Sequence, residues 1–489
     1  MTLMIEGHTF HYEMENLCRL FCPQEKIFVT EETAEPQAGG MLVYTGLKER
    51  PDGSSLLTVR LTAGDSAKSS ASLLPAGTPE EEKKRRMAVA LWKMLSEQFG
   101  FLPGWGILTG VRPIKLFGRI AAEKGTDAAV EYFREKLLVS AEKAELARAT
   151  WENEEKILAG CRPRGFSLYI SIPFCPTRCS YCSFVSSSVE KTFRLIPKYV
   201  ELLCEEIRRT AEIAESLGLR AQTVYFGGGT PTALSADQLA ALIAAVRESF
   251  DLSDCHEFTV EAGRPDTVTA EKLAAMKLGG VTRISINPQT LNDEVLRAIG
   301  RKHTSAQTLS AFALAREHGF GNINMDLIAG LPEDTLESFQ NTVEGVLRLS
   351  PESITVHTLA LKRAARLSQE GEPGKAGPAA QMLAFADEAL LNAGYRPYYL
   401  YRQSRMVGNL ENTGWAKPGF ENLYNVFIME ECQSVLACGA GGVTKLRDPG
   451  SERIERVFNF KYPYEYIGRY EEILGRKERV KEFYGKTDG

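Results

Sequence analysis

Short apolar runs alternate with longer amphipathic segments through the central part of the chain. Runs of this length are typical of buried strands, and apolar positions that recur every three or four residues are typical of helices. Strands that are joined by helices pair in parallel, so the pattern predicts strand–helix units around a parallel sheet. The predicted strands are Leu168–Phe174, Thr223–Phe226, Glu257–Glu261, Arg283–Asn287, Asn324–Ile328 and Ile354–Leu359.

An amphipathic segment follows each of these runs. The alternation predicts an α/β fold in the form of a partial (β/α)6 barrel. In such folds the functional residues lie on the loops that follow the carboxyl ends of the strands. The predicted helices are Ile196–Leu217, Ser235–Phe250, Thr269–Leu278, Asp293–Ile299, Ala306–His318 and Thr335–Leu349.

The first part of the chain has a different texture. Strand-like stretches separated by Gly, Pro and Asp come first, and helical patterns follow. We interpret residues 1–160 as a separate α+β module of unknown role. It shows no catalytic constellation, because His8 and His11 are isolated residues in a strand-like stretch. The predicted elements are strands at Lys26–Thr30, Met41–Thr45 and Ser55–Leu61 and helices at Pro79–Phe99, Ile114–Lys124, Thr126–Lys136 and Ser140–Leu158.

A loop rich in Gly, Lys and Pro, Glu370–Pro378, ends the strand–helix alternation. We therefore expect the barrel domain to occupy residues 166–370. A helix at Ala379–Ala393, an aromatic stretch and a charged terminal helix at Tyr464–Arg476 come after the loop. These features predict a smaller C-terminal domain, residues 375–489, that closes over the mouth of the barrel.

Length and charge restrict the function classes. With 489 residues, the chain is longer than a typical domain of roughly 100–200 residues, so two or three domains are expected. The 58 basic and 63 acidic residues give a net charge of −5, which argues against bulk binding to nucleic acid or anionic membranes. Charges interrupt the first twenty residues, and no apolar run approaches ~20 residues, so we expect neither a signal peptide nor a membrane span. We therefore interpret the ten cysteines as reduced thiols and expect a cytoplasmic protein.

Three cysteines lie directly after the first predicted strand. The segment LYISIPFCPTRCSYCSF holds Cys175, Cys179 and Cys182 in a C-x3-C-x2-C spacing. Thiolates are the usual ligands of iron–sulfur clusters, and three of them leave one iron of a cubane open to a small chelating molecule. A zinc site is the alternative, but zinc normally takes four closing ligands, and no fourth Cys or His follows at finger spacing. The spacing therefore favours a 4Fe–4S cluster.

Polar or glycine-rich positions follow the other predicted strands. Glycines allow a close approach of the backbone to a ligand, and a buried unpaired carboxylate costs several kcal/mol, so Asp326 within an apolar strand needs a partner. Each of these residues taken alone could be a structural salt-bridge or capping residue, and His303 and His357 are ambiguous in the same way. Together they favour a polar nucleoside pocket at the carboxyl ends of the strands. The residues concerned are Gly227–Pro231, Glu261, Asn287, Gln289, Arg301 and Asp326.

These motifs together resemble the oxygen-independent coproporphyrinogen III oxidase family of radical S-adenosylmethionine (SAM) proteins. The matching segments are YISIPFCPTRCSYC, VYFGGGTPT, NMDLIAGLP and WAKPG, and the match extends over about two-thirds of the chain. The resemblance implies a radical SAM barrel in which Cys175, Cys179 and Cys182 bind a 4Fe–4S cluster. The GWGILTGVRP stretch is similar to the longer HemZ-type (coproporphyrinogen dehydrogenase) subgroup. By the same resemblance, the contacts to SAM are Tyr169, Gly228, Gly229, Thr230, Glu261, Gln289, Arg301, Asp326 and Ala360.

Two positions depart from the family pattern. Ser171 stands where the family often has a histidine, and Phe184 stands where authenticated oxidases tend to carry a fourth cysteine. A phenylalanine at this place is more similar to the haem-chaperone relatives. Both departures leave the cluster and SAM motifs intact. They concern which tetrapyrrole is the substrate and how a second SAM is held.

The resemblance implies a reaction and its partners. Two propionate side chains of coproporphyrinogen III would be oxidatively decarboxylated to vinyl groups, giving protoporphyrinogen IX, with a flavodoxin or ferredoxin as electron donor. Arg162, Arg164 and Arg178 flank the cysteine segment and are candidates to bind substrate carboxylates. Two alternatives stay open: a haem-binding chaperone, which Phe184 favours and the N-terminal module disfavours, and a radical SAM haem methyltransferase or ring-opening enzyme.

Overall fold

The computed structural model describes residues 1–23, 25–32, 40–182, 187–360, 377–403 and 407–485. The chain divides into two compact units. The first unit holds Met1–Ala149, Ser368–Gln381 and Tyr401–Glu411, and the second holds Thr150–Leu367, Met382–Leu400 and Asn412–Gly489. The predicted boundary at 370–375 lies outside the described residues, and the three-domain division stays a prediction.

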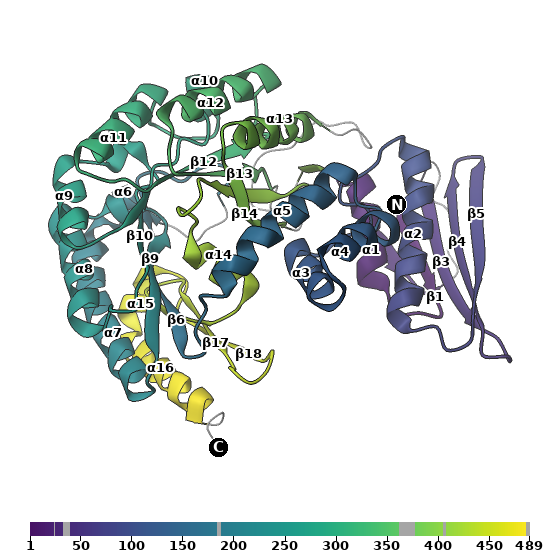
Figure 1. Cartoon of the computed structure of the whole chain (residues 1–489), viewed down its shortest axis with the longest axis horizontal. Coiled ribbons are helices and arrows are strands. Elements are labelled where there is room, and N and C mark those ends of the chain that lie inside the picture. Colours follow the sequence, from purple (N-terminus) through teal and green to yellow (C-terminus); the bar gives the residue numbers. More distant parts are fainter. Residues whose placement is uncertain (24, 33–39, 183–186, 361–376, 404–406, 486–489) are drawn as a thin grey trace. The chain divides into compact units, whose positions relative to one another are not determined.

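A five-stranded sheet with two helices on one face forms the start of the first unit (Figure 1). The strand order is β2-β1-β3-β4-β5, parallel around β1 and antiparallel from β3 to β5. The helices α1 and α2 pack against each other, and α2 covers β4, with Leu17, Leu91 and Val59 fully buried. The bounds are β1 Thr2–Glu6, α1 His11–Phe21, β2 Phe28–Thr30, β3 Met41–Glu49, β4 Ser55–Ala63, β5 Ser66–Leu74 and α2 Glu80–Phe99.

Helices α3 (Pro113–Lys124), α4 (Thr126–Glu131) and α5 (Ala141–Leu158) follow, with one π-helical turn at Tyr132–Lys136. The segment GWGILTGVRP lies between α2 and α3. Its Trp105 is buried and donates its indole N–H to Glu411 at 2.6 Å, within the same unit. This conspicuous motif therefore has a packing role in the described structure.

The predicted strand-like stretch around His8 and His11 is wrong, because His11 opens helix α1. Buried Met14, Leu17 and Phe21 have the spacing of one helical face, so the signal was present in the sequence. Strand β5 was not predicted either. Its sequence SAKSSASLL lacks β-branched and aromatic residues, and it forms a strand because β4 pairs with it along its whole length.

Six parallel strands form the centre of the second unit, as the apolar runs predicted. Their order along the sheet is β6-β9-β10-β11-β12-β13, so each strand lies beside the next one of the series. Strand β6 is buried along nearly its whole length, which is typical of a parallel sheet covered on both faces. The bounds are β6 Gly165–Ile172, β9 Arg220–Gly228, β10 Glu257–Glu261, β11 Arg283–Ser285, β12 Ile323–Ala329 and β13 Ser353–Thr358.

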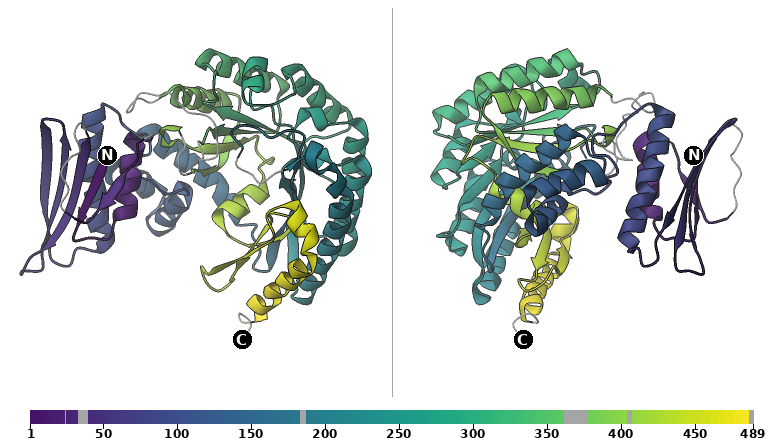
Figure 2. Two further views of the ribbon diagram at one scale, coloured as in Figure 1. Left: turned by 180° about the vertical axis from the view of Figure 1, so that it is seen from behind. Right: turned by 45° about the vertical axis from the view of Figure 1, so that its right-hand side comes forward.

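Helices α7 to α12 lie around the outside of this curved sheet (Figures 1 and 2). Their apolar faces pack on the strands, as in α7, where Leu203 and Ile207 are fully buried. No helix in the described part of the chain is long and apolar enough to cross a membrane. The bounds are α7 Ile196–Ser216, α8 Ala236–Ser249, α9 Ala270–Leu278, α10 Asp293–Ala298, α11 Ser305–Glu317 and α12 Leu336–Leu349.

The last part of the chain extends the same sheet. That this part is a smaller domain closing over the barrel mouth stays a prediction. Strands β14 and β15 continue the sheet beyond β13, and β16, β17 and β18 continue it beyond β6. Strand β16 pairs in parallel with β6, which continues the parallel arrangement. The bounds are α13 Pro378–Asn392, β14 Arg396–Tyr401, β15 Asn412–Ala416, α14 Leu423–Glu430, β16 Ser434–Cys438, β17 Val443–Arg447, β18 Ile454–Phe458, α15 Pro463–Gly468 and α16 Tyr470–Gly485.

Candidate active site

The three cysteines lie on the loop that leaves the carboxyl end of β6. Cys175 ends the two-residue strand β7 (Phe174–Cys175), and Cys179 and Cys182 follow in the loop. The loop is fastened to the residues after α10, because the Ser180 amide donates to the Ile299 carbonyl at 3.1 Å. The loop geometry therefore places three thiols at the edge where the parallel strands end.

All three thiols are free of disulfides, Cys179 is buried, and Cys175 and Cys182 are half-buried. The described residues contain no group of three ligating side chains already assembled as a metal site. Residues 183–186, with Phe184, lie outside the described residues. The donor set itself fits an iron–sulfur cluster, since thiolates are the ligands that such clusters take.

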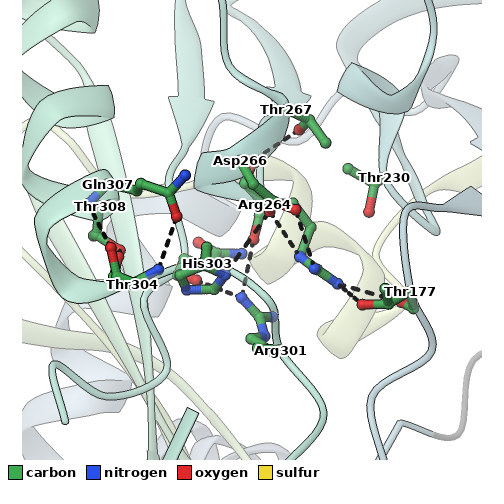
Figure 3. Close-up of polar contacts among 12 residues, drawn as sticks. Thr177, Thr230, Arg264, Asp266, Thr267, Arg301, His303, Thr304, Gln307 and Thr308 are labelled. Carbon is green, nitrogen blue, oxygen red and sulfur yellow. Dashed lines mark hydrogen bonds and ion pairs between the residues drawn. The ribbon is translucent and has the colours of Figure 1, made fainter. Parts of the chain in front are cut away.

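Arg264 connects the cysteine loop to the residues that follow β10 (Figure 3). Its Nη1 donates to the Thr177 hydroxyl at 3.0 Å and lies 4.0 Å from the Cys179 Sγ. On its other side the guanidinium forms an ion pair with Asp266 at 3.1 Å. The side chain is almost fully buried, so a fixed positive charge stands beside the loop. Arg264 was not predicted from the sequence, although it follows Glu261 by three residues.

The glycine run after β9 is bound to the cysteine loop through its backbone. Gly229 N donates to the Ile172 carbonyl and Thr230 N to the Phe174 carbonyl, each at 2.7 Å. Gly228 has a φ of +106°, and a Cβ at Gly229 would lie 2.6 Å from the Phe174 carbonyl oxygen. Both positions therefore require glycine. The Thr230 hydroxyl lies 3.5 Å from the Cys175 Sγ, so this run also borders the predicted cluster.

Three tyrosines from β6, β9 and α14 are stacked on one another. Tyr169 of β6 and Tyr225 of β9 are paired in register, and Tyr424 of α14 lies 4.3 Å from the Tyr225 ring and 6.1 Å from the Tyr169 ring. The Tyr225 hydroxyl donates to Glu261 Oε1 at 2.5 Å. Tyr169 was predicted, whereas Tyr225 and Tyr424 were missed. For Tyr424 the sequence held no signal, because its segment is distant and has no recognisable motif.

Glu261 ends β10, and Asp326 lies within β12, but the two carboxyl groups have opposite titration behaviour. Burial raises the pKa of Glu261 to about 7, with the Asp326 charge as a further cause and the Tyr225 hydrogen bond opposing it. Burial also acts to raise the pKa of Asp326, but hydrogen bonds from His357 and Asn324 outweigh it and hold that pKa below the ordinary value. Near neutral pH, Asp326 is an anion and Glu261 is close to half-protonated.

Gln289 and Arg301 both lie at the same edge of the sheet. Gln289 has a φ of +68°, an uncommon conformation for a residue with a side chain. It is held there by two backbone hydrogen bonds to β12, from Gln289 N to the Asp326 carbonyl and from Ile328 N to the Gln289 carbonyl. Arg301 is buried and donates to the Asn287 carbonyl at 2.8 Å.

Two buried polar atoms beside these contacts have no hydrogen-bond partner among the described residues, the Arg301 Nε and the Asn287 Oδ1. Buried polar groups are normally paired. This orphaned donor and acceptor therefore fit a polar ligand at the strand ends. Ala360, the remaining predicted SAM contact, follows β13 and is the last described residue before the 361–376 gap.

The two histidines have different surroundings. His357 Nε2 lies 3.9 Å from Asp326 Oδ2, at the strand ends. His303 is buried 3.8 Å from Asp266, and its burial, together with Arg301 and Arg264, lowers its pKa to about 4. His303 is therefore neutral at physiological pH.

The three arginines predicted to bind substrate carboxylates do not lie together. Arg162 and Arg164 precede β6, and its eight residues span roughly 25 Å, so the cysteine loop begins at the far end of the strand. Arg162 forms an ion pair with Asp254, and Arg164 donates to the Leu217 carbonyl. Arg162 and Arg164 are therefore near the cysteines in sequence but separated from them in space by the length of β6, and their role as carboxylate ligands stays a prediction. Arg178 is exposed within the loop.

The model of the radical SAM superfamily matches residues 169–346. The chain is 36% identical over 415 residues to the oxygen-independent coproporphyrinogen-III oxidase-like protein HemZ of Bacillus subtilis, covering 83% of each chain. The chain belongs to the HemZ-like family of radical SAM proteins. It is also 31% identical to the heme chaperone HemW of Lactococcus lactis, over 65% of this chain and 79% of that protein.

A solved structure supports the same fold. The chain superposes on the radical SAM coproporphyrinogen III oxidase HemN of Escherichia coli with a TM-score of 0.51 at 24% identity, covering 68% of this chain and 73% of that chain. As a radical SAM protein of the HemZ type, this chain has a 4Fe–4S cluster and SAM as its implied cofactors. The three thiolate ligands that the loop can supply and the orphaned polar atoms at the strand ends fit these two groups.

Proposed function

We propose that this radical SAM protein is an oxygen-independent coproporphyrinogen III oxidase, which converts two propionate side chains to vinyl groups and yields protoporphyrinogen IX. The observation that carries the proposal is the likeness to HemZ, which covers 83% of both chains. That likeness reaches beyond the 65% of this chain matched by the HemW chaperone. A tetrapyrrole is thus the proposed substrate class, and a flavodoxin or ferredoxin is the proposed electron donor.

When bound, the cluster and SAM supply a 5′-deoxyadenosyl radical that removes one hydrogen atom from the substrate. We assign Cys175, Cys179 and Cys182 to the cluster. Their sulfurs would be the three protein ligands of the cluster, and Arg264 holds their loop in place through Thr177.

The strand-end residues bind and orient SAM in this proposal. Asp326, an anion fixed by Asn324 and His357, accepts hydrogen bonds from ligand hydroxyl groups. When it is ionised, Glu261 accepts a hydrogen bond or forms an ion pair with an ammonium group. The glycine run lets the ligand approach the backbone. The other proposed SAM contacts are Tyr169, Gln289, Arg301 and Ala360.

Each decarboxylation takes up one electron from the donor and releases one electron to an acceptor. The donor would supply one electron for each SAM that is cleaved, and hydrogen abstraction would leave the radical on the propionate carbon attached to the pyrrole ring, β to the carboxylate. Loss of CO2 and of one electron to an acceptor then leaves the vinyl group. Two such rounds account for two CO2, two methionines and two 5′-deoxyadenosines for each product.

An anaerobic assay tests this proposal. Reconstituted protein is mixed with SAM, a strong reductant, an electron acceptor and coproporphyrinogen III, and the products are analysed by mass spectrometry. We expect 5′-deoxyadenosine together with a tetrapyrrole that has lost two carboxyl groups. Deoxyadenosine without decarboxylation would overturn the substrate assignment while leaving the radical chemistry in place.

A haem chaperone is the second candidate, and the HemW likeness is the observation that favours it. This candidate predicts stoichiometric, tight haem binding and no substrate-dependent cleavage of SAM. A haem titration followed by absorbance, in parallel with the oxidase assay, separates the two. Formation of S-adenosylhomocysteine or of an opened haem ring would instead indicate a methyltransferase or a ring-opening enzyme.

A further inference from the structure

Two cysteines that no cofactor requires lie side by side in the second unit. The Cys161 and Cys432 sulfurs are 2.8 Å apart, although 271 positions separate the two residues in the chain. A disulfide bond measures about 2.05 Å, so the sulfurs need to approach by less than about 1 Å to be bonded. Both side chains are half-buried, which leaves the pair open to a small reagent.

The pairing of β6 and β16 explains this closeness. The two strands are parallel neighbours, with Phe166 opposite Ser434, so the segments that enter them meet at the same edge. Each segment is anchored to the helix before it. Cys161 N donates to the Leu158 carbonyl at 2.9 Å, and Cys432 N donates to the Phe427 carbonyl at 3.4 Å. The proximity of the thiols is thus built into the sheet.

The two thiols are chemically unequal. The hydrogen bond between the two thiols lowers the pKa of Cys161, burial opposes this, and the positive charge of Arg447 adds to the lowering. The same hydrogen bond and burial raise the pKa of Cys432. A thiol with a lowered pKa beside one with a raised pKa is the usual arrangement of a reactive dithiol, in which the first thiol attacks as the thiolate and the second resolves the adduct.

We propose that Cys161 and Cys432 form a reversible disulfide, a modification site separate from the cluster loop. The Cys161 thiolate attacks a low-molecular-weight disulfide and releases one small thiol, leaving a mixed disulfide. Cys432 then attacks the Cys161 sulfur and releases the second small thiol. In total, two protein thiols and one small disulfide give one protein disulfide and two small thiols, a transfer of two electrons and two protons.

The bond would join the entries of β6 and β16 and enclose the six parallel strands from β6 to β13 in one covalent loop. A disulfide that closes a long loop stabilises chiefly by restricting the unfolded chain. The cluster cysteines lie at the other end of β6, roughly 25 Å away, so oxidation of this pair leaves the cluster ligands in place. The proposal does not depend on the tetrapyrrole chemistry.

Cluster-loaded full-length protein is incubated anaerobically with oxidised glutathione, the remaining thiols are alkylated, and the digest is analysed by mass spectrometry. We expect one cross-linked peptide pair containing Cys161 and Cys432, reversible by a reducing thiol, and a melting temperature raised by roughly 5 °C or more. The cluster absorbance should not change.

Variants separate this pair from general thiol oxidation. Cys432→Ser should leave a stable glutathione adduct on Cys161, because the resolving thiol is gone, and Cys161→Ser should lose the cross-link and the thermal shift. Cys255→Ser is the matched control, since Cys255 is half-buried and burial raises its pKa to about 11. Full alkylation of Cys161 and Cys432 after oxidant treatment would overturn the proposal, as would glutathione on wild-type Cys161 without a cross-link.

Discussion

Arg264 Nη1 donates to the Thr177 hydroxyl at 3.0 Å, and this bond joins the end of β10 to the cysteine loop that follows β6. The same guanidinium forms an ion pair with Asp266 and lies 4.0 Å from the Cys179 sulfur. A buried cation beside thiolate ligands stabilises the more negative state of a cluster electrostatically. Arg264 therefore acts on the loop both by position and by charge.

Replacing Arg264 with alanine tests this relationship. Asp266 loses its buried partner, and we expect a loss of about 3 kcal/mol in the free energy of unfolding of the apoprotein, measured in urea. In the reconstituted protein we expect a lower cluster reduction potential in a redox titration, because a nearby positive charge is gone. Arg297→Ala is the control, since that arginine is exposed on α10. Equal potentials in the two variants would contradict an electrostatic role.

Glu261→Gln should have a stability effect that depends on pH. The folded pKa of about 7 lies above the ordinary value of 4.5, so the folded protein binds this proton more tightly than the unfolded chain. Ionisation of this carboxyl group therefore destabilises the fold. The destabilisation is absent below pH 4.5, grows between pH 4.5 and 7, and is complete above pH 7. The difference between the folded and unfolded pKa corresponds to a loss of up to about 3 kcal/mol in the free energy of unfolding.

Urea unfolding of the apoprotein at pH 5 and pH 8 measures this effect. We expect the glutamine variant to be more stable than wild type at pH 8 and nearly equal to it at pH 5, while its affinity for SAM falls. Exposed Glu271 on α9 provides the control substitution, Glu271→Gln. A stability difference of the same size at both pH values would show that the carboxyl group of Glu261 does not titrate in this range.

Most of the second unit could be predicted from the sequence. The predicted strand Glu257–Glu261 coincides with β10, and the predicted helix Thr269–Leu278 differs from α9 by one residue, because buried strands and amphipathic helices leave distinct periods. Strand β16 could not be predicted as a neighbour of β6. That pairing joins segments about 270 positions apart, and no local pattern records it.

The candidate site was predictable where a motif stands at a strand end and was missed where tertiary packing supplies the residue. Asp326 could be recognised because an acid inside an apolar strand is conspicuous. Tyr424 could not, since only folding brings α14 to the Tyr225 ring. Arg162 shows that closeness in sequence to the cysteines does not give closeness in space, because the length of β6 separates them.

Cys179→Ala should abolish both the cluster and the cleavage of SAM. Two thiolates do not hold a cubane that uses three, so we expect reconstituted protein to lose its iron, its visible absorbance and its 5′-deoxyadenosine product. Cys255→Ala should keep all three, because that thiol lies before β10 and outside the loop. Iron content, absorbance and chromatography of the nucleoside products provide the measurements. Retained cleavage of SAM in Cys179→Ala would contradict the cluster assignment.

Asp326→Asn should separate SAM binding from cluster binding. The carboxylate is held by the Asn324 side-chain amide at 2.7 Å and faces His357, so its position is fixed before any ligand arrives. Losing the charge removes a charge-assisted hydrogen bond to a ligand hydroxyl, which is worth roughly 1.5–3 kcal/mol, or about a tenfold to hundredfold loss of affinity. Calorimetric titration with SAM measures this change, and cluster absorbance should stay as in wild type. Asp237→Asn, at an exposed position on α8, should leave both unchanged. Unaltered SAM affinity in Asp326→Asn would place the ligand elsewhere on this edge of the sheet.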